Sequence, residues 1–200
     1  MQIVYGTGNR AKLAHMRRHL EPLGLTLVGL DSFDPLPSVA ETGRTPLQNA
    51  RLKAHAYYRM LARPVFSCDS GLYFTGLPDA LQPGVHVRTP QGRYLDDEAM
   101  TAYYGDLARE YGGLTARYHN AICFVLDEGH VYESEDASLW GDAFRIVAQP
   151  HPRREAGFPL DRISVHIPTG LYYYDMDKPD VDGGTLPEGF RRFFRQALSL

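Results

Sequence analysis

Four groups of polar residues in the first half of the chain have the types needed to bind a phosphoryl group together with a hard metal cation. They offer two lysines for anionic oxygens, two carboxylates for a hard cation, and amide and hydroxyl groups for hydrogen bonds. Mg²⁺ is usually held by one or two carboxylates together with substrate phosphates, and it can orient an attacking water. In chain order the groups are Thr7, Asn9 and Lys12; Glu41; Asn49 and Lys53; and Asp69 with Ser70.

The first group lies in a stretch that reads QIVYGTGNRAK, residues 2–12. Four strand-like residues enter a turn with two glycines, and a helical pattern starts near Arg10. Free N–H groups at a helix N-terminus favour an anion, and glycine lets the backbone approach a phosphate closely. The spacing matches neither GxxxxGK[ST] nor GxGxxG, so a tight turn after a buried strand explains the stretch equally well.

A helix is predicted to carry the second lysine. Thr45-Pro46 provides a capping hydroxyl followed by proline at the first helical position, and the helical pattern continues to about Leu61. Asn49 and Lys53 are four residues apart, so we expect both side chains on one face of this helix.

A short apolar strand, Val65–Cys68, is predicted to end in a turn at Asp69-Ser70-Gly71. A carboxylate at the C-terminal end of a buried strand lies where α/β folds usually bind ligands. Taken alone, Asp69 is equally a turn residue, just as Glu41 alone is a solvated acid in the long loop Asp31–Thr45.

The other elements come from periodicity and turn residues. Parallel βαβ units followed by a β-meander predict an α/β fold with a mixed twisted sheet, flanking helices and two lobes around a cleft. We treat residues 1–200 as a single domain. We expect strands at 2–5, 25–28, 137–144 and 162–167, and a hairpin of two strands at 116–126 and 130–133. We expect one helix to start near residue 10 and two more to span 96–111 and 188–198. Irregular segments are expected at 77–93 and 149–158, and Gly183-Gly184 precedes the last helix.

Composition excludes several classes of protein. The chain has 200 residues, 44% of them hydrophobic, and a net charge of −3, so no basic surface indicates a nucleic-acid polymer as partner. No apolar run is long enough to cross a membrane, and we see no signal peptide. Cys68 and Cys123 are the only cysteines, which suggests a reducing, cytoplasmic location. The scattered histidines form no zinc motif.

Taken together, the motifs resemble the inosine triphosphate pyrophosphatase family. The order and spacing match over roughly the first 90 residues. The matching segments are Gly6-Thr7-Gly8-Asn9-x-x-Lys12, Glu41-Thr42-Gly43, Asn49-Ala50-x-x-Lys53-Ala54 and Asp69-Ser70-Gly71-Leu72.

The resemblance implies a two-lobed α/β fold with a nucleotide cleft, usually in a homodimer. It implies hydrolysis of nucleoside triphosphates to monophosphate and pyrophosphate, dependent on Mg²⁺ (or Mn²⁺), with a preference for deaminated purines. By position, Glu41 and Asp69 would hold the metal and the attacking water. The triphosphate would contact Thr7, Asn9, Lys12 and Lys53, with Asn49 and Ser70 beside it.

Cys68 is the sharpest departure from the family, which usually has two acidic residues before Ser-Gly. A thiol with an ordinary pKa is mostly neutral at pH 7 and is a poor substitute for a carboxylate that activates water. If the chain has already turned at this point, Cys68 and Asp69 both face the site, and Cys68 takes the catalytic position. This is the interpretation we adopt; the alternative is that strand geometry persists and Cys68 is packing.

The base-binding motifs match less well. Arg88 follows Pro83-Gly84 where the family has Ser-Ala-Arg. Gly157-Phe158-Pro159-Leu160-Asp161 stands in for Gly-Phe-Gly-Tyr-Asp, so Phe158 can stack on a base and Asp161 is retained. The family's Ser-His-Arg is absent; Arg191 or Arg192 could replace it, although both can equally lie on a helix surface.

The hypothesis is therefore a nucleoside triphosphate pyrophosphohydrolase with altered base recognition. Two alternatives stay open. One is the same chemistry on a different modified nucleotide, and the other is a catalytically weak nucleotide-binding protein in which Cys68 marks lost activity.

Overall fold

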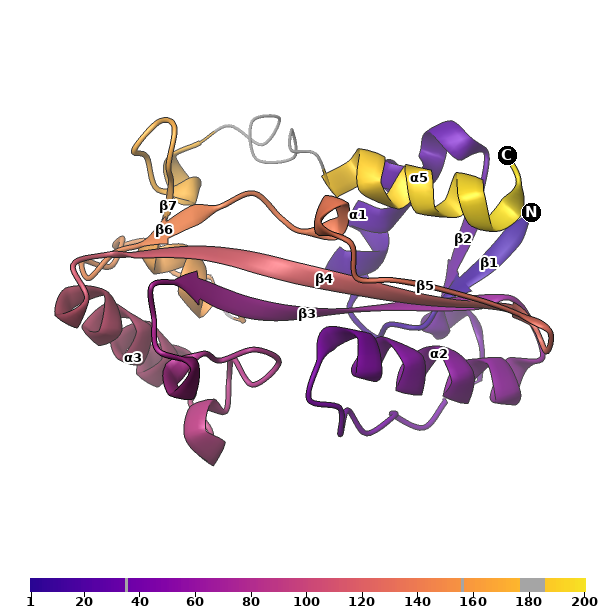
Figure 1. The fold of residues 1–200 in the computed structure, drawn as a ribbon, viewed down its shortest axis with the longest axis horizontal. Coiled ribbons are helices and arrows are strands. Elements are labelled where there is room, and N and C mark those ends of the chain that lie inside the picture. Colours follow the sequence, from indigo (N-terminus) through magenta and orange to yellow (C-terminus); the bar gives the residue numbers. More distant parts are fainter. Residues whose placement is uncertain (35, 156, 177–185) are drawn as a thin grey trace. The chain divides into compact units, whose positions relative to one another are not determined.

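The computed structural model describes residues 1–34, 36–155, 157–176 and 186–200, so the predicted Gly183-Gly184 punctuation lies outside the described residues. The chain divides into two compact units. The first unit comprises Met1–Ser70, His119–Trp140 and Thr185–Leu200, and the second comprises Gly71–Tyr118 and Gly141–Gly184. Two strands, β3 (Val65–Thr75) and β4 (Leu114–Asp127), contribute residues to both units (Figure 1).

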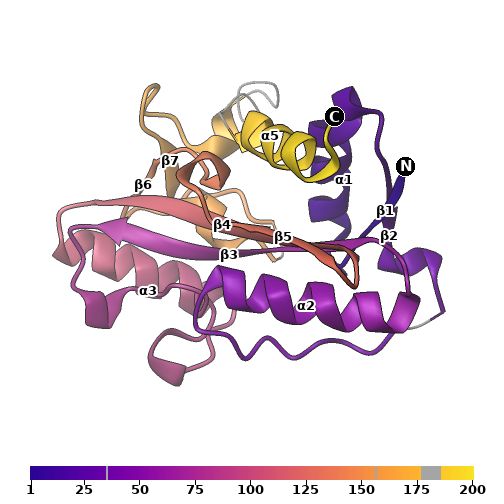
Figure 2. The same cartoon turned by 45° about the vertical axis from the view of Figure 1, so that its right-hand side comes forward.

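Helices cover both faces of the strands in the first unit. Helices α1 and α5 lie on one face and α2 on the other, as both views show (Figures 1 and 2). Besides its parts of β3 and β4, the unit contains β1 (Gln2–Tyr5), α1 (Arg10–Leu20), β2 (Thr26–Gly29), α2 (Pro46–Leu61), β5 (His130–Ser134) and α5 (Leu186–Leu198).

The helices start where the sequence provides caps. Asn9 Oδ1 accepts hydrogen bonds from the first turn of α1, and Thr45 Oγ1 accepts one from Gln48 N ahead of α2. The apolar residues of α1 and α5, including Leu13 and Phe194, pack with Phe66 of β3 in one buried cluster. The apolar face of α2 packs on the opposite face of the strands.

The sheet is mixed, as predicted, and the α/β fold class is confirmed. The strand order is β2-β1-β3-β4-β6-β7, with β5 pairing with β4. β1 pairs in parallel with β2 and β3, whereas β4 pairs antiparallel with β5 and β6. The cleft between two lobes and the single domain over residues 1–200 stay predictions.

The second unit has one long helix, α3 (Asp97–Glu110), and two short strands, β6 (Phe144–Ile146) and β7 (Ser164–His166). Asp96 Oδ1 caps α3 by accepting from Ala99 N. The buried cluster of this unit joins residues of α3, β6 and the second half of β3, including Leu72, Tyr104 and Ile146. The described part of this unit also contains short 3-10 helices at Asp79–Leu81 (η3), Pro90–Gly92 (η4), Pro159–Ile163 (η6) and Tyr173–Asp175 (η7).

The predicted turn after Cys68 is wrong. β3 continues through Asp69, Ser70 and Gly71 to Thr75, and Gly71 is not among the glycines with a positive φ. Pairing beside β4 keeps the backbone extended, which overrides the local turn preference of an Asp-Ser-Gly sequence.

Two predicted strands are also too long. Residues 137–144 do not extend the meander, because Asp136 Oδ1 accepts from Ser138 N and starts a 3-10 turn at Ala137–Leu139; β6 begins only at Phe144. Of the predicted strand at residues 162–167, only Ser164–His166 is strand, because Pro159 starts the 3-10 helix η6, which extends to Ile163.

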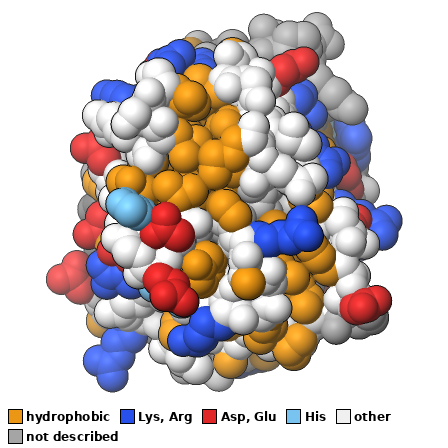
Figure 3. Space-filling model, turned by 90° about the vertical axis from the view of Figure 1, so that its right-hand side faces the viewer, with side chains coloured by type: hydrophobic (Ala, Val, Ile, Leu, Met, Phe, Trp, Pro, Cys, Tyr) orange, Lys and Arg blue, Asp and Glu red, His pale blue; other side chains and the backbone are white. Residues whose placement is uncertain are grey.

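Hydrophobic side chains gather on the face of the first unit near both chain ends, with charged groups around them (Figure 3). Exposed hydrophobic residues of this unit include Met1, Met60, Val131 and Leu200. Among the residues described, no helix has the length and apolar character needed to cross a membrane.

Gly189 of α5 allows the helix to lie against Ser138, and a mutation there tests this packing. A Cβ at Gly189 would lie 1.9 Å from the Ser138 carbonyl oxygen, which is backbone and cannot move aside cheaply. We expect Gly189→Ala to lower the free energy of unfolding by about 1–3 kcal/mol or more, measured by urea denaturation. Gly129→Ala is the control, because its Cβ meets only an ordinary 3.6 Å contact. Equal stability of the two variants would contradict the packing.

Candidate active site

The buried carboxylate of Asp69 is the centre of the polar cluster in the first unit. Asp69 Oδ2 accepts a hydrogen bond of 3.0 Å from Asn49 Nδ2, and Oδ1 lies 3.0 Å from Lys53 Nζ. Both partners lie on α2, one helical turn apart, as their spacing predicted. The exposed fractions are 7% for Asp69, 2% for Asn49 and 9% for Lys53, so these groups exchange hydrogen bonds with one another rather than with bulk water.

Lys53 also binds the second carboxylate. Its Nζ lies 3.1 Å from Glu41 Oε1, so one ammonium bridges Glu41 and Asp69. Burial by itself lowers the pKa of Lys53, but the two carboxylates outweigh burial and the pKa is raised overall. The lysine is therefore charged at any physiological pH and compensates both acids.

Asn49 fixes the loop that carries Glu41. Its Oδ1 accepts a 2.8 Å hydrogen bond from Gly43 N, while its Nδ2 is used by Asp69. A Cβ at Gly43 would lie 2.6 Å from this same Oδ1, so only glycine fits here. Both polar ends of Asn49 thus bind protein groups that position Glu41 and Asp69, while its predicted contact with substrate stays a prediction.

The N-terminal turn is built as a helix cap. Asn9 Oδ1 accepts from Ala11 N at 2.9 Å and Lys12 N at 3.1 Å, and Thr7 Oγ1 accepts from Asn9 N at 3.2 Å. The oxygens of both side chains are therefore used, and the Asn9 amide and Thr7 hydroxyl hydrogens are the groups left to donate. Lys12 is exposed in the first turn of α1.

Ser70 has a partner that the sequence did not reveal. Its hydroxyl donates to Asn120 Oδ1 at 2.6 Å, and Asn120 Nδ2 donates to the Leu139 carbonyl at 2.7 Å. Asn120 lies on β4, fifty residues along the chain from Ser70. No local sequence pattern shows which residue of β4 lies beside Ser70, so the pairing with Asn120 could not be predicted from the sequence.

Cys68 points away from Asp69, and the interpretation that both face the site is wrong. Because β3 stays extended, neighbouring side chains lie on opposite faces. Cys68 belongs to the buried cluster with Tyr5 and Phe66, whereas Asp69 faces α2. Burial raises the pKa of the Cys68 thiol to about 12, against the opposing influence of Lys12. The thiol is neutral and packed, so the alternative interpretation, in which strand geometry persists and Cys68 is a packing residue, is the correct one.

Of the remaining predicted residues, the three arginines have partners of their own. In the second unit, Arg88 Nη1 lies 2.8 Å from Asp97 Oδ1. Phe158 is half-exposed, and the carboxylate of Asp161 accepts no hydrogen bond from any described residue. In the first unit, Arg191 pairs with Glu188 and Arg192 with Asp136 and Ser138. Both arginines lie on α5 with these partners, which supports the helix-surface interpretation for them.

The cluster in the first unit fits a hard divalent cation in ligand type. Glu41 and Asp69 supply oxygen ligands beside one ammonium, and Mg²⁺ commonly takes one or two carboxylates and completes its shell with water and substrate phosphates. The described residues contain no group of three or more His, Cys, Asp and Glu side chains that could enclose a metal.

Comparisons with known proteins place the chain in a family. The model of the Ham1 family matches residues 3–177, and the chain belongs to this family. The chain is 38% identical over 171 residues to a dITP/XTP pyrophosphatase of Mycobacterium bovis (82% of this chain, 78% of the relative). It is 34% identical over 167 residues to that of Geobacillus kaustophilus (81% and 76%). The resemblance drawn from the sequence motifs is confirmed.

Solved structures agree with the fold. A HAM1 protein from Coxiella burnetii matches with a TM-score of 0.74 at 21% identity, covering 100% of this chain and 98% of that one. A nucleoside-triphosphatase / dITP/XTP pyrophosphatase from Mycobacterium abscessus matches with a TM-score of 0.62 at 27% identity (99% and 94%). The match to the dITP/XTP pyrophosphatase of Streptomyces avermitilis covers 65% of that relative's length.

Because Cys68 is packed in the core, we expect that a carboxylate at this position would not speed up hydrolysis. Cys68→Asp would bury a carboxylate in an apolar cluster, so we expect it to lower the free energy of unfolding by about 1–3 kcal/mol and to leave hydrolysis no faster. Burial would raise the pKa of the new acid, so the stability loss should be largest at high pH and shrink as the pH falls. Urea denaturation across pH measures it.

Cys68→Ser is the matched control, because it introduces a small polar group without a charge. Its stability should show no such pH dependence. A stable Cys68→Asp variant with a higher kcat would contradict the packing role.

Proposed function

We propose that this chain is a nucleoside triphosphate pyrophosphohydrolase that depends on Mg²⁺ (or Mn²⁺). It would cleave a non-standard purine NTP or dNTP to the monophosphate and pyrophosphate. The observation that carries the proposal is the cluster in which one ammonium, Lys53 Nζ, joins Glu41 and Asp69. The names of the relatives, dITP/XTP pyrophosphatases, support the substrate class.

Four residues of the first unit would bind the phosphate oxygens of the substrate. Lys12 and Lys53 face the phosphate oxygens and stabilise the charge that develops on the leaving pyrophosphate. The Thr7 hydroxyl and the Asn9 amide donate to the same oxygens. A bound Mg²⁺ would supply further charge neutralisation and polarise the phosphoryl group.

Glu41 is the residue we assign to the attacking water. Its Oε1 binds Lys53, whereas its Oε2 has no hydrogen-bond partner among the described residues, and 47% of its side chain is exposed. This oxygen can accept a proton from a water that attacks the α-phosphorus. Asp69, whose two oxygens bind Asn49 and Lys53 of α2, holds Lys53 in place and would hold the metal together with Glu41.

Two residues predicted to contact the base, Phe158 and Asp161, stay predictions. Phe158, with 43% of its surface exposed, offers a ring face for stacking. Asp161 follows it on η6 and offers a carboxylate to a base N–H. Arg88 is bound to Asp97, so we propose that it supports this region rather than contacting phosphate.

A catalytically weak nucleotide-binding protein is the alternative, and the observation in its favour is Cys68. The buried, neutral thiol supplies no charge at a position where relatives in the family usually have an acid. The intact pairing of Glu41, Lys53 and Asp69 favours the enzyme.

A homodimer and a cytoplasmic location stay predictions. The exposed hydrophobic residues of the first unit, such as Met60 and Val131, support self-association, which light scattering of the purified chain would measure. Both cysteines are free and buried, which agrees with a reducing compartment.

The function is tested by the products. Incubation with a panel of nucleoside triphosphates and Mg²⁺ should release pyrophosphate rather than orthophosphate, and excess chelator should stop the release. We expect Glu41→Gln to lower kcat by about 10²–10⁴-fold, because the amide cannot accept a proton from water. Glu128→Gln, at an exposed position of the hairpin, is the control. Full turnover in excess chelator would refute the metal assignment, and binding without any product would favour the alternative.

Replacing either lysine should weaken triphosphate binding, but only the replacement of Lys53 should also lower the stability of the fold. Lys12→Met, at an exposed position, should weaken triphosphate binding about tenfold and leave the unfolding transition unchanged. Lys53→Met should weaken binding and also destabilise the fold, because losing one partner of a buried ion pair costs roughly 3–5 kcal/mol, and less where a partner such as Glu41 is half-exposed. The double variant should be non-additive in binding if both contact one ligand. Unchanged affinity in both single variants, measured by calorimetry, would show that the anion site is misplaced.

A further inference from the structure

The turn at residues 6–9 joins β1 to α1 and is attached to β3 through both backbone groups of Gly6. Gly6 N donates a 2.8 Å hydrogen bond to the Phe66 carbonyl. The Gly6 carbonyl accepts a 3.0 Å hydrogen bond from Ser67 Oγ. This turn carries two of the groups proposed to bind phosphate, so we call it the phosphate turn.

The Ser67 hydroxyl lies inside the protein, beneath the phosphate turn. Ser67 is 0% exposed, so its side chain has no direct access to a substrate. A Cβ at Gly6 would lie 2.3 Å from Ser67 Oγ and 2.9 Å from Tyr57 Cδ2, so the turn is in direct contact with β3 and α2. Gly6 is itself buried, and a buried carbonyl needs a donor, which the Ser67 hydroxyl supplies.

The glycine at the start of the turn makes this attachment important. Thr7 N donates to the Tyr5 carbonyl at 2.8 Å, which closes a γ-turn around Gly6. A γ-turn restrains a single residue, and glycine has more backbone freedom than any other residue type. Without the Ser67 donor, the Gly6 carbonyl would be free to reorient, and the peptide groups that follow it would reorient as well.

Further hydrogen bonds connect the phosphate turn to Lys12. Asn9 N donates to Thr7 Oγ1 at 3.2 Å, and Asn9 Oδ1 accepts from Lys12 N at 3.1 Å. The turn and the first residues of α1 therefore form one hydrogen-bonded unit. A change in the orientation of Gly6 would reach Lys12 through these bonds.

Ser67 lies on the same face of β3 as Asp69. Residues two apart on a strand share a face and are separated by about 6.6 Å along it. Asp69 binds Asn49 and Lys53 of α2, whereas Ser67 binds the phosphate turn. All these groups belong to the first unit, so one strand sets the separation between the phosphate turn and the acidic cluster.

We propose that Ser67 is a positioning residue for phosphate binding, because its hydroxyl fixes the Gly6 carbonyl and thereby orients the phosphate turn and Lys12. This inference rests on the proposed function, since it takes the turn as the phosphate end of the site. Holding the turn in its binding conformation removes the cost of ordering it when the ligand binds. Ser67 brings neither a charge nor a contact of its own to the ligand, so its effect is on affinity and not on the chemical step.

Inorganic pyrophosphate with Mg²⁺ is the probe that tests this role, because it carries neither base nor sugar. We expect Ser67→Ala to weaken its binding, measured by calorimetry, about threefold to tenfold, as for the loss of one net hydrogen bond. KM for the nucleoside triphosphate should rise by a similar factor, with kcat changed by less than about twofold. The rate constant should persist because Glu41 is held by Lys53 and not by Ser67.

Ser164→Ala is the matched control. Ser164 is 4% exposed, and its Oγ donates to the Leu160 carbonyl at 2.8 Å in the second unit. Each substitution removes a buried hydroxyl from a carbonyl, so both should lower the urea midpoint of unfolding. Only Ser67→Ala should weaken pyrophosphate binding. Ser67→Thr keeps the hydroxyl and should retain the wild-type affinity, even where the added methyl group lowers stability.

A double-mutant cycle with Lys12 distinguishes positioning from a general loss of stability. If Ser67 acts through the turn that orients Lys12, Ser67→Ala should cost less affinity in a Lys12→Met background than in the wild-type chain. Equal losses in the two backgrounds would contradict the coupling.

Hydrogen exchange of the wild-type chain without ligand tests the geometry independently of any variant. The amides of Gly6 and Thr7 should be protected, because each donates to a backbone carbonyl. Exchange of both at the rate of an unstructured peptide would show that the turn is not held against β3 and would overturn the inference.

Binding and turnover together separate this inference from the function. Wild-type affinity in Ser67→Ala, while Lys12→Met weakens binding, would overturn the inference and leave the anion site and the enzyme standing. Weaker pyrophosphate binding in Ser67→Ala, without hydrolysis of any nucleoside triphosphate by the wild-type chain, would support the inference and refute the catalytic proposal. Unchanged affinity in both Lys12→Met and Ser67→Ala would overturn the inference together with the anion site.

Discussion

The first unit depends on one ammonium that compensates two acids. Placing Lys53 Nζ at 3.0 Å from Asp69 and 3.1 Å from Glu41 joins α2, β3 and the loop before α2 through a single charge. A lysine with 9% of its surface exposed would be costly to keep charged without such partners, and the two acids would repel each other without it. Asn49 completes the arrangement by binding both Asp69 and Gly43. The positions of the candidate catalytic groups therefore follow from charge compensation as much as from packing.

Because β3 is a continuous strand, neighbouring side chains lie on opposite faces of the sheet and have different roles. Phe66 and Cys68 face the cluster shared with α1 and α5, whereas Val65 and Asp69 face α2. A period of two lets one strand supply both an apolar core and a polar site. The same alternation removes the thiol from the site although it adjoins Asp69 in the sequence. Its position among Tyr5 and Phe66 explains why a small, neutral side chain is accommodated there.

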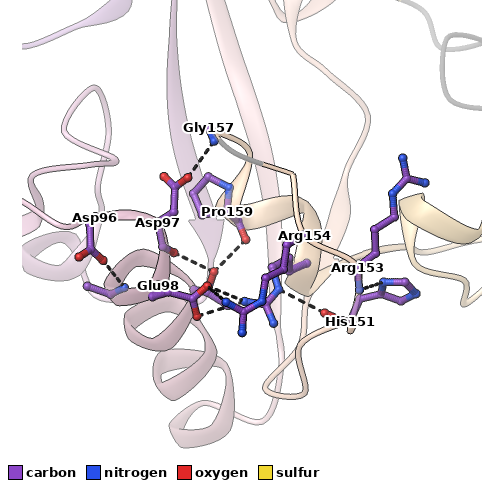
Figure 4. Close-up of polar contacts among 11 residues, drawn as sticks. Asp96, Asp97, Glu98, His151, Arg153, Arg154, Gly157 and Pro159 are labelled. Atoms are coloured by element: carbon purple, nitrogen blue, oxygen red, sulfur yellow. Dashed lines mark hydrogen bonds and ion pairs between the residues drawn. The ribbon is translucent and has the colours of Figure 1, made fainter.

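In the second unit, acids at the start of α3 control the polar side chains. Asp97 and Glu98 lie in the first helical turn, where negative charge is favoured by the helix dipole, and they also neutralise Arg88, Arg154 and Arg162. The arginines are thus used for structure in this unit, and their charges are already compensated by neighbouring acids (Figure 4).

Much of the local structure was predictable from the sequence, because its causes are local. The cap at Thr45 and apolar spacing predicted α2, and apolar spacing predicted the start of α1 and the bounds of α3 to within a residue or two. Parallel units followed by a meander indicated the mixed sheet. The spacing of Asn49 and Lys53 correctly placed both on one face, because helix periodicity is fixed by the backbone. The four polar motifs identified the family.

What only the tertiary structure decided depends on partners distant in the chain. The sequence Asp-Ser-Gly has a turn preference, but strand pairing beside β4 kept it extended, and this reversed the orientation assigned to Cys68. The pairings of Ser70 with Asn120 and of Arg88 and Gly157 with Asp97 arise from strand register and helix packing, which no local window contains. Whether an arginine is free or paired, and whether an acid is compensated, is set by side chains brought together from separate segments. Charge–charge energies fall with distance in space and not along the sequence, so composition alone could not reveal them.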